Sequence, residues 1–205
     1  SNYGVLGRGA SSVVVLAIYN DPESEHNGKK FAMKLVDLKA VKAPVIENEI
    51  QSIMNMKSDF IVRLYDAFSR EGSIHMILEY MELGSLEDVC KVIPNQKIPD
   101  DVLREIAGQL MQALAHLEEK HIVHRDIKPA NCLLNKKGKC KLGDFGFSRR
   151  KMEEKDILQT YQGSITYMSP ERIQGKEHGY NSDVWSVGVT ILECALGRYP
   201  FHDKE

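Results

Sequence analysis

Two short polar segments in the middle of the chain contain the residue types that phosphoryl transfer requires. Residues 124–131 include Asp126, Lys128 and Asn131, and residues 144–146 begin with Asp144. Carboxylate and amide oxygens are the ligands that Mg²⁺ prefers, so Asn131 and Asp144 are candidate metal ligands. Asp126 can accept the proton of an attacking hydroxyl, and Lys128 offers positive charge to a transferring phosphoryl group. Each residue alone reads as a satisfied loop side chain, but the set in this order predicts a phosphoryl-transfer site.

A further charged group, Lys34, lies in an apolar segment, where an ammonium group needs a partner or must reach water. Two carboxylates, Glu47 and Glu49, follow in a stretch with helical spacing, and because they are two residues apart they face different directions. Glu49 flanks an apolar stripe that contains Ile46 and Ile50. We therefore predict that Glu49 pairs with Lys34, although a surface lysine is the commoner reading of this residue taken singly.

A glycine-rich turn precedes this segment, with Gly7 and Gly9 just before an apolar run. Small residues let backbone N–H groups approach phosphate oxygens closely. A simple hairpin turn is the commoner explanation of two glycines. A dinucleotide-binding turn is excluded because a strand, not a helix, follows the glycines.

The elements that must position these groups divide the chain into two parts. Apolar and β-branched runs at residues 13–19, 31–38, 61–68 and 74–80 predict strands, with the first two forming an antiparallel pair. Helical spacing appears at residues 43–56, from Pro99 onward and at residues 182–196. The sequence therefore predicts a strand-rich front and a helix-rich back, joined near residues 79–84.

Composition narrows the class of protein. The 205 residues are 42% hydrophobic and 27% charged, as in ordinary globular chains, and the net charge is −2. No basic excess exists to bind nucleic acid or an anionic membrane surface. The four cysteines form no C-x-x-C pair, which indicates reduced thiols. No apolar stretch is long enough to span a bilayer and no signal peptide is visible, so we expect a cytoplasmic protein that binds neither nucleic acid nor membrane.

Taken together, the glycine turn, the strand lysine, H-R-D-x-K-x-x-N, D-F-G and Ser169-Pro170-Glu171 resemble the signature of eukaryotic protein kinases. The resemblance covers essentially the whole chain. It implies an α+β, bilobal kinase fold over residues 1–205, with a β-rich N-lobe at about 1–80, a hinge at 79–84 and a helical C-lobe at 85–205. The C-lobe is expected to be incomplete, because the family has further helices after the second long helix. The sequence departs from the family pattern at Ser12, Gly143 and Ser169.

The resemblance also implies ATP and Mg²⁺ as cofactors and assigns roles to single residues. Asp126 is the expected catalytic base, Lys128 stabilises the γ-phosphate, and Lys34, paired with Glu49, holds the α and β phosphates. Asn131 and Asp144 are expected to hold Mg²⁺. The expected nucleotide-binding residues are Leu6, Gly7, Gly9, Val14, Ala32, Lys34, Leu78, Glu79, Met81 and Leu133. Asp183 is expected to anchor the catalytic loop, and the hydrophobic column between the lobes is expected to comprise Ile53, Leu64, His124 and Phe145.

A lysine two residues after the H-R-D motif, here Lys128, resembles the pattern of serine/threonine kinases. The segments at 163–173 and 197–201 are similar to those of MAP kinase kinases. That group is dual-specificity, so the implied substrates are Thr and Tyr of a MAP kinase, under an upstream activating kinase. Counting back from Ser164 puts the two phosphoacceptor positions on Asp156 and Thr160. We predict Thr160 as the activating site, Asp156 as a partial mimic of a phosphate, and Arg125 as a receiver of the phosphate.

Three alternatives remain beside this reading. A different serine/threonine kinase from an upstream level of the MAP kinase cascade shares several of the same features. A pseudokinase or scaffold should lack Lys34, Asp126, Asn131 or Asp144, and all four are present. A small-molecule or lipid kinase fits poorly with the Ser-Pro-Glu segment and the peptide-binding loop before it.

Overall fold

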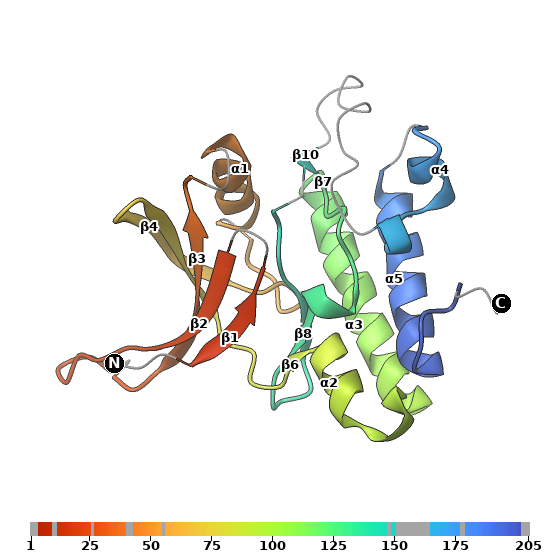
Figure 1. Ribbon diagram of the computed structural model, residues 1–205, viewed down its shortest axis with the longest axis horizontal. Helices are drawn as coiled ribbons and strands as arrows, with labels where there is room; N and C mark the ends of the chain where they lie inside the picture. Colours follow the sequence, from red (N-terminus) through yellow and green to blue (C-terminus); the bar gives the residue numbers. More distant parts are fainter. Residues whose placement is uncertain are drawn as a thin grey trace.

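A five-stranded antiparallel sheet forms the N-terminal lobe, with one helix beside it (Figure 1). The computed structural model describes residues 4–9, 12–25, 27–39, 43–54, 56–146, 149–150, 165–176 and 179–201. The strand order is β1-β2-β3-β5-β4. The elements are β1 (Val5–Arg8), β2 (Ser12–Ile18), β3 (Lys30–Asp37), α1 (Ala43–Ile53), β4 (Leu64–Arg70) and β5 (Ser73–Glu79).

The register of this sheet confirms the predicted antiparallel pair and corrects one predicted strand. β2 pairs with β3 from Ser12 opposite Val36 to Ile18 opposite Lys30. The run at 61–68 was expected to be one strand, but only its part from Leu64 belongs to β4. Ile61 forms a bridge to Leu142 in the other lobe instead. Apolar and aromatic residues occur on both sides of Arg63, although most of β4 after Leu64 is exposed, so the sequence pattern does not mark the change of partner.

The C-terminal lobe is mostly helical, and its two long helices, α3 and α5, lie side by side (Figure 1). Its helices are α2 (Leu86–Val92), α3 (Asp100–Glu119), α4 (Pro170–Ile173) and α5 (Tyr180–Leu196), with short 3₁₀ turns at Pro94–Gln96, Pro129–Asn131 and Ile165–Tyr167. Its short strands are β6 (Gly84–Ser85), β7 (Ile122–Val123), β8 (Cys132–Leu134), β9 (Cys140–Leu142) and β10 (Arg149–Arg150). The architecture is the α+β, two-lobed fold that the sequence predicted.

Helix ends in this lobe follow local sequence signals. Ser85 and Asp88 form a reciprocal capping box at the start of α2, in which each side chain accepts a hydrogen bond from the backbone N–H of the other. Pro99 lies immediately before α3, as predicted. The helix then buries one stripe that consists of Leu103, Ile106, Leu110, Ala113, Leu114 and Leu117. Burial of this stripe, rather than intrinsic propensity, supplies most of the stability of such a helix.

A single hydrophobic core joins the two lobes. It includes Ile53 and Leu64 from the N-terminal lobe, Leu110 from α3, and Phe145 from the loop between them. The helix predicted over residues 43–56 ends earlier, at Ile53, and the next residue, Met54, is 60% exposed.

All four cysteines are free thiols, as the sequence suggested. Cys132, Cys140 and Cys194 are buried in the core, and burial raises the pKa of Cys140 to about 12. In the part of the chain that is described, no helix is both long and apolar enough to cross a membrane.

Leu110 and its neighbour Met111 provide a direct test of the α3 packing. Leu110 is fully buried and Met111 is 45% exposed. We expect Leu110→Ala to lower the free energy of unfolding by about 2–5 kcal/mol, because it removes buried contacts and leaves a cavity. Met111→Ala should change it by less than about 0.5 kcal/mol. Chemical denaturation of both variants measures the difference, and equal losses would contradict this packing.

Candidate active site

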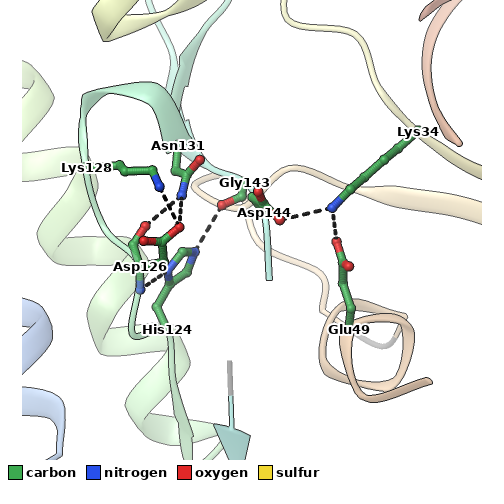
Figure 2. A network of polar contacts seen from close by, with 8 residues as sticks. All are labelled: Lys34, Glu49, His124, Asp126, Lys128, Asn131, Gly143 and Asp144. Carbon is green, nitrogen blue, oxygen red and sulfur yellow. Dashed lines mark hydrogen bonds and ion pairs between the residues drawn. The ribbon is translucent and has the colours of Figure 1, made fainter. Parts of the chain in front are cut away.

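An ammonium group and two carboxylates meet where the lobes face each other (Figure 2). Lys34, in the middle of β3, donates to Glu49 Oε1 at 2.6 Å and to Asp144 Oδ1 at 3.0 Å. Glu49 comes from α1 and Asp144 from the loop after β9, so three separate elements contribute one group each. The predicted pairing of Lys34 with Glu49, rather than with Glu47, is confirmed.

The charges of Lys34, Glu49 and Asp144 shift one another's pKa values. Burial by itself would lower the pKa of Lys34, but the attraction of Asp144 and Glu49 outweighs it and raises the pKa. Burial would raise the pKa of Asp144, yet the charge and hydrogen bond of Lys34 hold it below its usual value. Lys34 is therefore charged and Asp144 ionised at neutral pH, which is the state required of a metal ligand.

The second polar group is the catalytic loop, where Asp126 is the central residue. Lys128 Nζ donates to Asp126 Oδ2 at 2.9 Å. Asn131 Nδ2 donates both to Asp126 Oδ2 at 2.9 Å and to the Asp126 carbonyl oxygen at 2.7 Å. The 3₁₀ turn at Pro129–Asn131 brings Asn131 back to Asp126. The structure thus brings together the three residues that the sequence placed in this loop.

These contacts fit a magnesium-bound nucleotide. Because both amide hydrogens of Asn131 point to Asp126, its side-chain oxygen faces away and is left as an acceptor. Mg²⁺ is usually held by one or two protein oxygens together with substrate phosphates. Asn131 and Asp144 would hold the metal, which would bring charge neutralisation to the phosphates. Consistent with so few protein ligands, the described residues contain no cluster of three or more His, Cys, Asp or Glu side chains suited to a metal.

His124 connects the two polar groups. Its Nδ1 accepts the Asp126 N–H at 3.3 Å, so its Nε2 carries the proton and donates to the Gly143 carbonyl at 3.0 Å (Figure 2). The ring also packs edge-on against Phe145, with 4.7 Å between the ring centres. His124 and Phe145 are almost fully buried. The loop that carries Asp144 is therefore fixed relative to the loop that carries Asp126.

Strand register places five of the predicted nucleotide-binding residues on one face of the sheet. Lys34 lies opposite Val14 on β2, and Ala32 lies opposite Leu78 on β5. Directly opposite residues share a face, and so do alternate residues on one strand. Gly7 lies opposite Val14, in the strand that also contains Leu6.

Three further predicted nucleotide-binding residues lie outside these paired strand positions. Gly9 lies in the turn after β1, where its N–H donates to the Ser12 carbonyl. Leu133 lies on β8 in the other lobe, and Met81 is buried just after β5. The glycine turn and the hinge lie at opposite ends of β3, because Ser12 pairs with Val36 and Glu79 pairs with Phe31.

An ion pair between the lobes was not anticipated from the sequence. Lys141 Nζ, on β9, donates to Glu79 Oε2 at 2.9 Å, and the same oxygen accepts the Arg63 N–H at 3.3 Å. The side chains are 12% and 21% exposed. Glu79 was predicted as a nucleotide-binding residue at the hinge, and its side chain connects the hinge to β9, the strand that precedes Asp144. Its position beside a hinge is the only sequence signal, because the partner is distant in the chain.

The predicted regulatory residues have different outcomes. Asp156 and Thr160 lie outside the described residues. Arg125 lies in the catalytic loop, with a φ angle of 71° and its N–H bonded to Asp183 Oδ1. The anchoring role expected of Asp183 agrees with this bond and with a second one from the His124 N–H at 2.7 Å.

The site combines three features: a glycine turn in the N-terminal lobe, the ion pair of Lys34 with Glu49, and the polar loop around Asp126 in the C-terminal lobe. These are the features that the sequence predicted for a protein kinase. The family description "Protein kinase domain" matches residues 1–205. The chain belongs to the protein kinase family.

Curated relatives narrow the similarity further. A dual specificity mitogen-activated protein kinase kinase 1 from Dictyostelium discoideum is 44% identical over 96% of this chain and 29% of its own length. A mitogen-activated protein kinase kinase 1c from Physcomitrium patens is 40% identical over 96% of this chain and 56% of its own. Mitogen-activated protein kinase kinase 2 from Arabidopsis thaliana is 38% identical, with 96% and 53% covered. The chain thus spans little more than half, or less, of these relatives.

Replacing Lys34 tests the charge cluster. We expect Lys34→Met to reduce phosphoryl transfer about 10²–10³-fold, as does the loss of a single group that stabilises transition-state charge. The matched control is Lys91→Met, which removes an ammonium from an exposed pair with Glu87 on α2. A transfer assay with both variants decides the matter. Equal activity of Lys34→Met and Lys91→Met would exclude a role for the cluster.

Proposed function

We propose that this chain transfers the γ-phosphoryl group of Mg·ATP to a MAP kinase, as a dual-specificity MAP kinase kinase. The observation that carries the proposal is the paired arrangement of Lys34 with Asp144 and of Asp126 with Lys128 and Asn131. The Lys34–Asp144 pair suits phosphate and metal, and Asp126 with Lys128 and Asn131 suits an incoming hydroxyl.

The roles of the residues follow from their contacts. Lys34, held by Glu49, directs its ammonium to the α and β phosphates, while Asp144 and Asn131 take the metal. Asp126 is 6% exposed and accepts the proton of the substrate hydroxyl. Lys128, 2.9 Å from Asp126, stabilises charge on the transferring group. Positioning and electrostatics of this kind account for most of the catalysis in phosphoryl transfer.

The substrate class rests on the relatives. Those described above carry the words "mitogen-activated protein kinase kinase" in their names, and one of them is called dual specificity. We infer that this chain also phosphorylates both Thr and Tyr of a MAP kinase, that an upstream kinase activates it, and that it acts in the cytoplasm.

A transfer assay with Mg·ATP and a panel of MAP kinases tests the proposal. We expect transfer to Thr and Tyr of one target, with Asp126→Ala lowering kcat about 10²–10⁴-fold because the general base is lost. Asp101→Ala, an exposed carboxylate on α3, is the matched control and should be fully active. Transfer to Ser or Thr peptides alone would favour another serine/threonine kinase of the cascade. Absence of magnesium-dependent nucleotide binding would leave only a scaffold.

We also propose that phosphorylation of Thr160 activates the enzyme. A phosphate on Thr160 would add charge and acceptor oxygens that an arginine such as Arg125 can bind, while Asp156 supplies only one permanent charge. Thr160→Ala should abolish stimulation by an upstream kinase, and Thr160→Glu should restore part of the activity. Full stimulation of Thr160→Ala, measured in the same transfer assay, would refute this site.

A further inference from the structure

The residue before Asp126 has an unusual backbone. Arg125 has a φ angle of 71°, in the left-handed region that residues other than glycine seldom adopt. Such a conformation is unfavourable and persists only where the surroundings enforce it. Because Arg125 immediately precedes Asp126, its conformation sets the direction of the Asp126 side chain. The groups that hold the Arg125 backbone therefore control the predicted base.

The backbone N–H of Arg125 is held by Asp183, a residue of α5. Asp183 Oδ1 accepts the Arg125 N–H at 2.9 Å, and Asp183 Oδ2 accepts the His124 N–H at 2.7 Å. Asp183 is only 2% exposed. A buried carboxylate without a nearby positive charge is costly, so this anchor requires compensation.

The backbone carbonyl of Arg125 is held by Arg172, a residue of α4. Arg172 Nη1 donates to the Arg125 carbonyl oxygen at 2.5 Å, and the Arg172 residue is 9% exposed. Burial lowers the pKa of Arg172, while the negative charges of Asp183 and Asp126 raise it, which means that the guanidinium lies in the field of both carboxylates. Its Nη2 is buried and has no hydrogen-bond partner in the described part of the chain. Among the described residues Arg172 has no ion pair within salt-bridge distance, so its charge acts on Asp183 and Asp126 through space.

Hydrogen bonds of serine hydroxyl groups connect α4, which carries Arg172, to α5, which carries Asp183. Ser182 Oγ, next to Asp183, donates to Glu171 Oε1 at 2.8 Å, next to Arg172. Ser169 Oγ donates to Ser182 Oγ at 3.0 Å. Because α4 and α5 are connected at these adjacent residues, Arg172 and Asp183 form one unit that grips both polar groups of the Arg125 residue.

We propose that Arg172 is a positioning residue for Asp126: its guanidinium holds the Arg125 carbonyl and balances Asp183, so that the left-handed turn before the base is maintained. This inference rests on the proposed kinase function only for its effect on turnover. A side chain that merely filled space would remove the Nη1 donor from the Arg125 carbonyl and the positive charge from the surroundings of Asp183. Arg172 also lies directly after Pro170 and Glu171, so it connects the position of α4 to the direction of the base.

Three variants of the purified protein test the proposal by steady-state kinetics. Arg172→Met should lower kcat at least tenfold while KM for ATP changes less than twofold, because the Lys34 cluster belongs to a different set of contacts. Arg172→Lys keeps the charge and one donor and should recover part of kcat. Val189→Ala, buried on α5, is the control for lost stability: at an equal fall in Tm it should retain kcat.

A double-mutant cycle and hydrogen exchange complete the test. If Arg172 acts through Asp126, then Arg172→Met should cause almost no further loss in an Asp126→Ala background. In Arg172→Met the amides of His124 and Arg125 should exchange at least tenfold faster, while those of α3 stay unchanged.

Several results would overturn the proposal. These are unchanged kcat, additive losses in the cycle, a rise in KM alone, unchanged amide exchange, or an equal loss of kcat in Val189→Ala. If the wild type shows no transfer, the proposed function fails, and the exchange of the two amides by itself decides whether Arg172 holds the loop.

Discussion

One ammonium group must serve two carboxylates that come from opposite lobes, and much of the architecture follows from that requirement. Lys34 is 15 residues from Glu49 and 110 residues from Asp144. Burial of the lysine would cost several kcal/mol without partners, so β3, α1 and the loop after β9 have to meet at one point. The sheet supplies rigidity on one side. On the other side the loop carrying Asp144 depends on His124 and Phe145, which are buried in the core that joins the lobes.

The catalytic loop faces a different difficulty, because it has little regular structure of its own. Its residues hold positions through side chains that bond to backbone groups: Asn131 to the carbonyl of Asp126, and Asp183 to two successive N–H groups. Such bonds leave the loop free to adopt conformations that a strand or helix forbids, including the left-handed turn at Arg125. Stability of the loop is thus supplied by α5 and α4, which themselves pack as ordinary helices.

Sequence reasoning recovered what depends on local pattern and on motif. The helical spacing after Pro99 and the choice of Glu49 follow from periodicity, and the pairing of β2 with β3 follows from two successive apolar runs. The loop residues follow from their order and type. It missed what depends on contacts between distant segments. Ile61 leaves the predicted strand to pair with Leu142, and the Lys141–Glu79 pair ties the hinge to β9. No local signal distinguishes these residues, because an apolar run or a single surface-type lysine looks the same whichever segment it meets.

Gly143 illustrates how backbone and space combine at this site. Its N–H donates to the Asn131 carbonyl at 2.9 Å and its carbonyl accepts from His124, so both of its polar groups link the two loops. A Cβ at this position would lie 3.3 Å from Leu133 Cδ1 and 3.4 Å from Val62 Cγ2, closer than most such contacts. The missing side chain therefore lets β8 and the segment after α1 approach the loop that carries Asp144. Since Leu133 is one of the expected nucleotide-binding residues, a larger residue at position 143 would displace an expected nucleotide contact and the loop of Asp144 together.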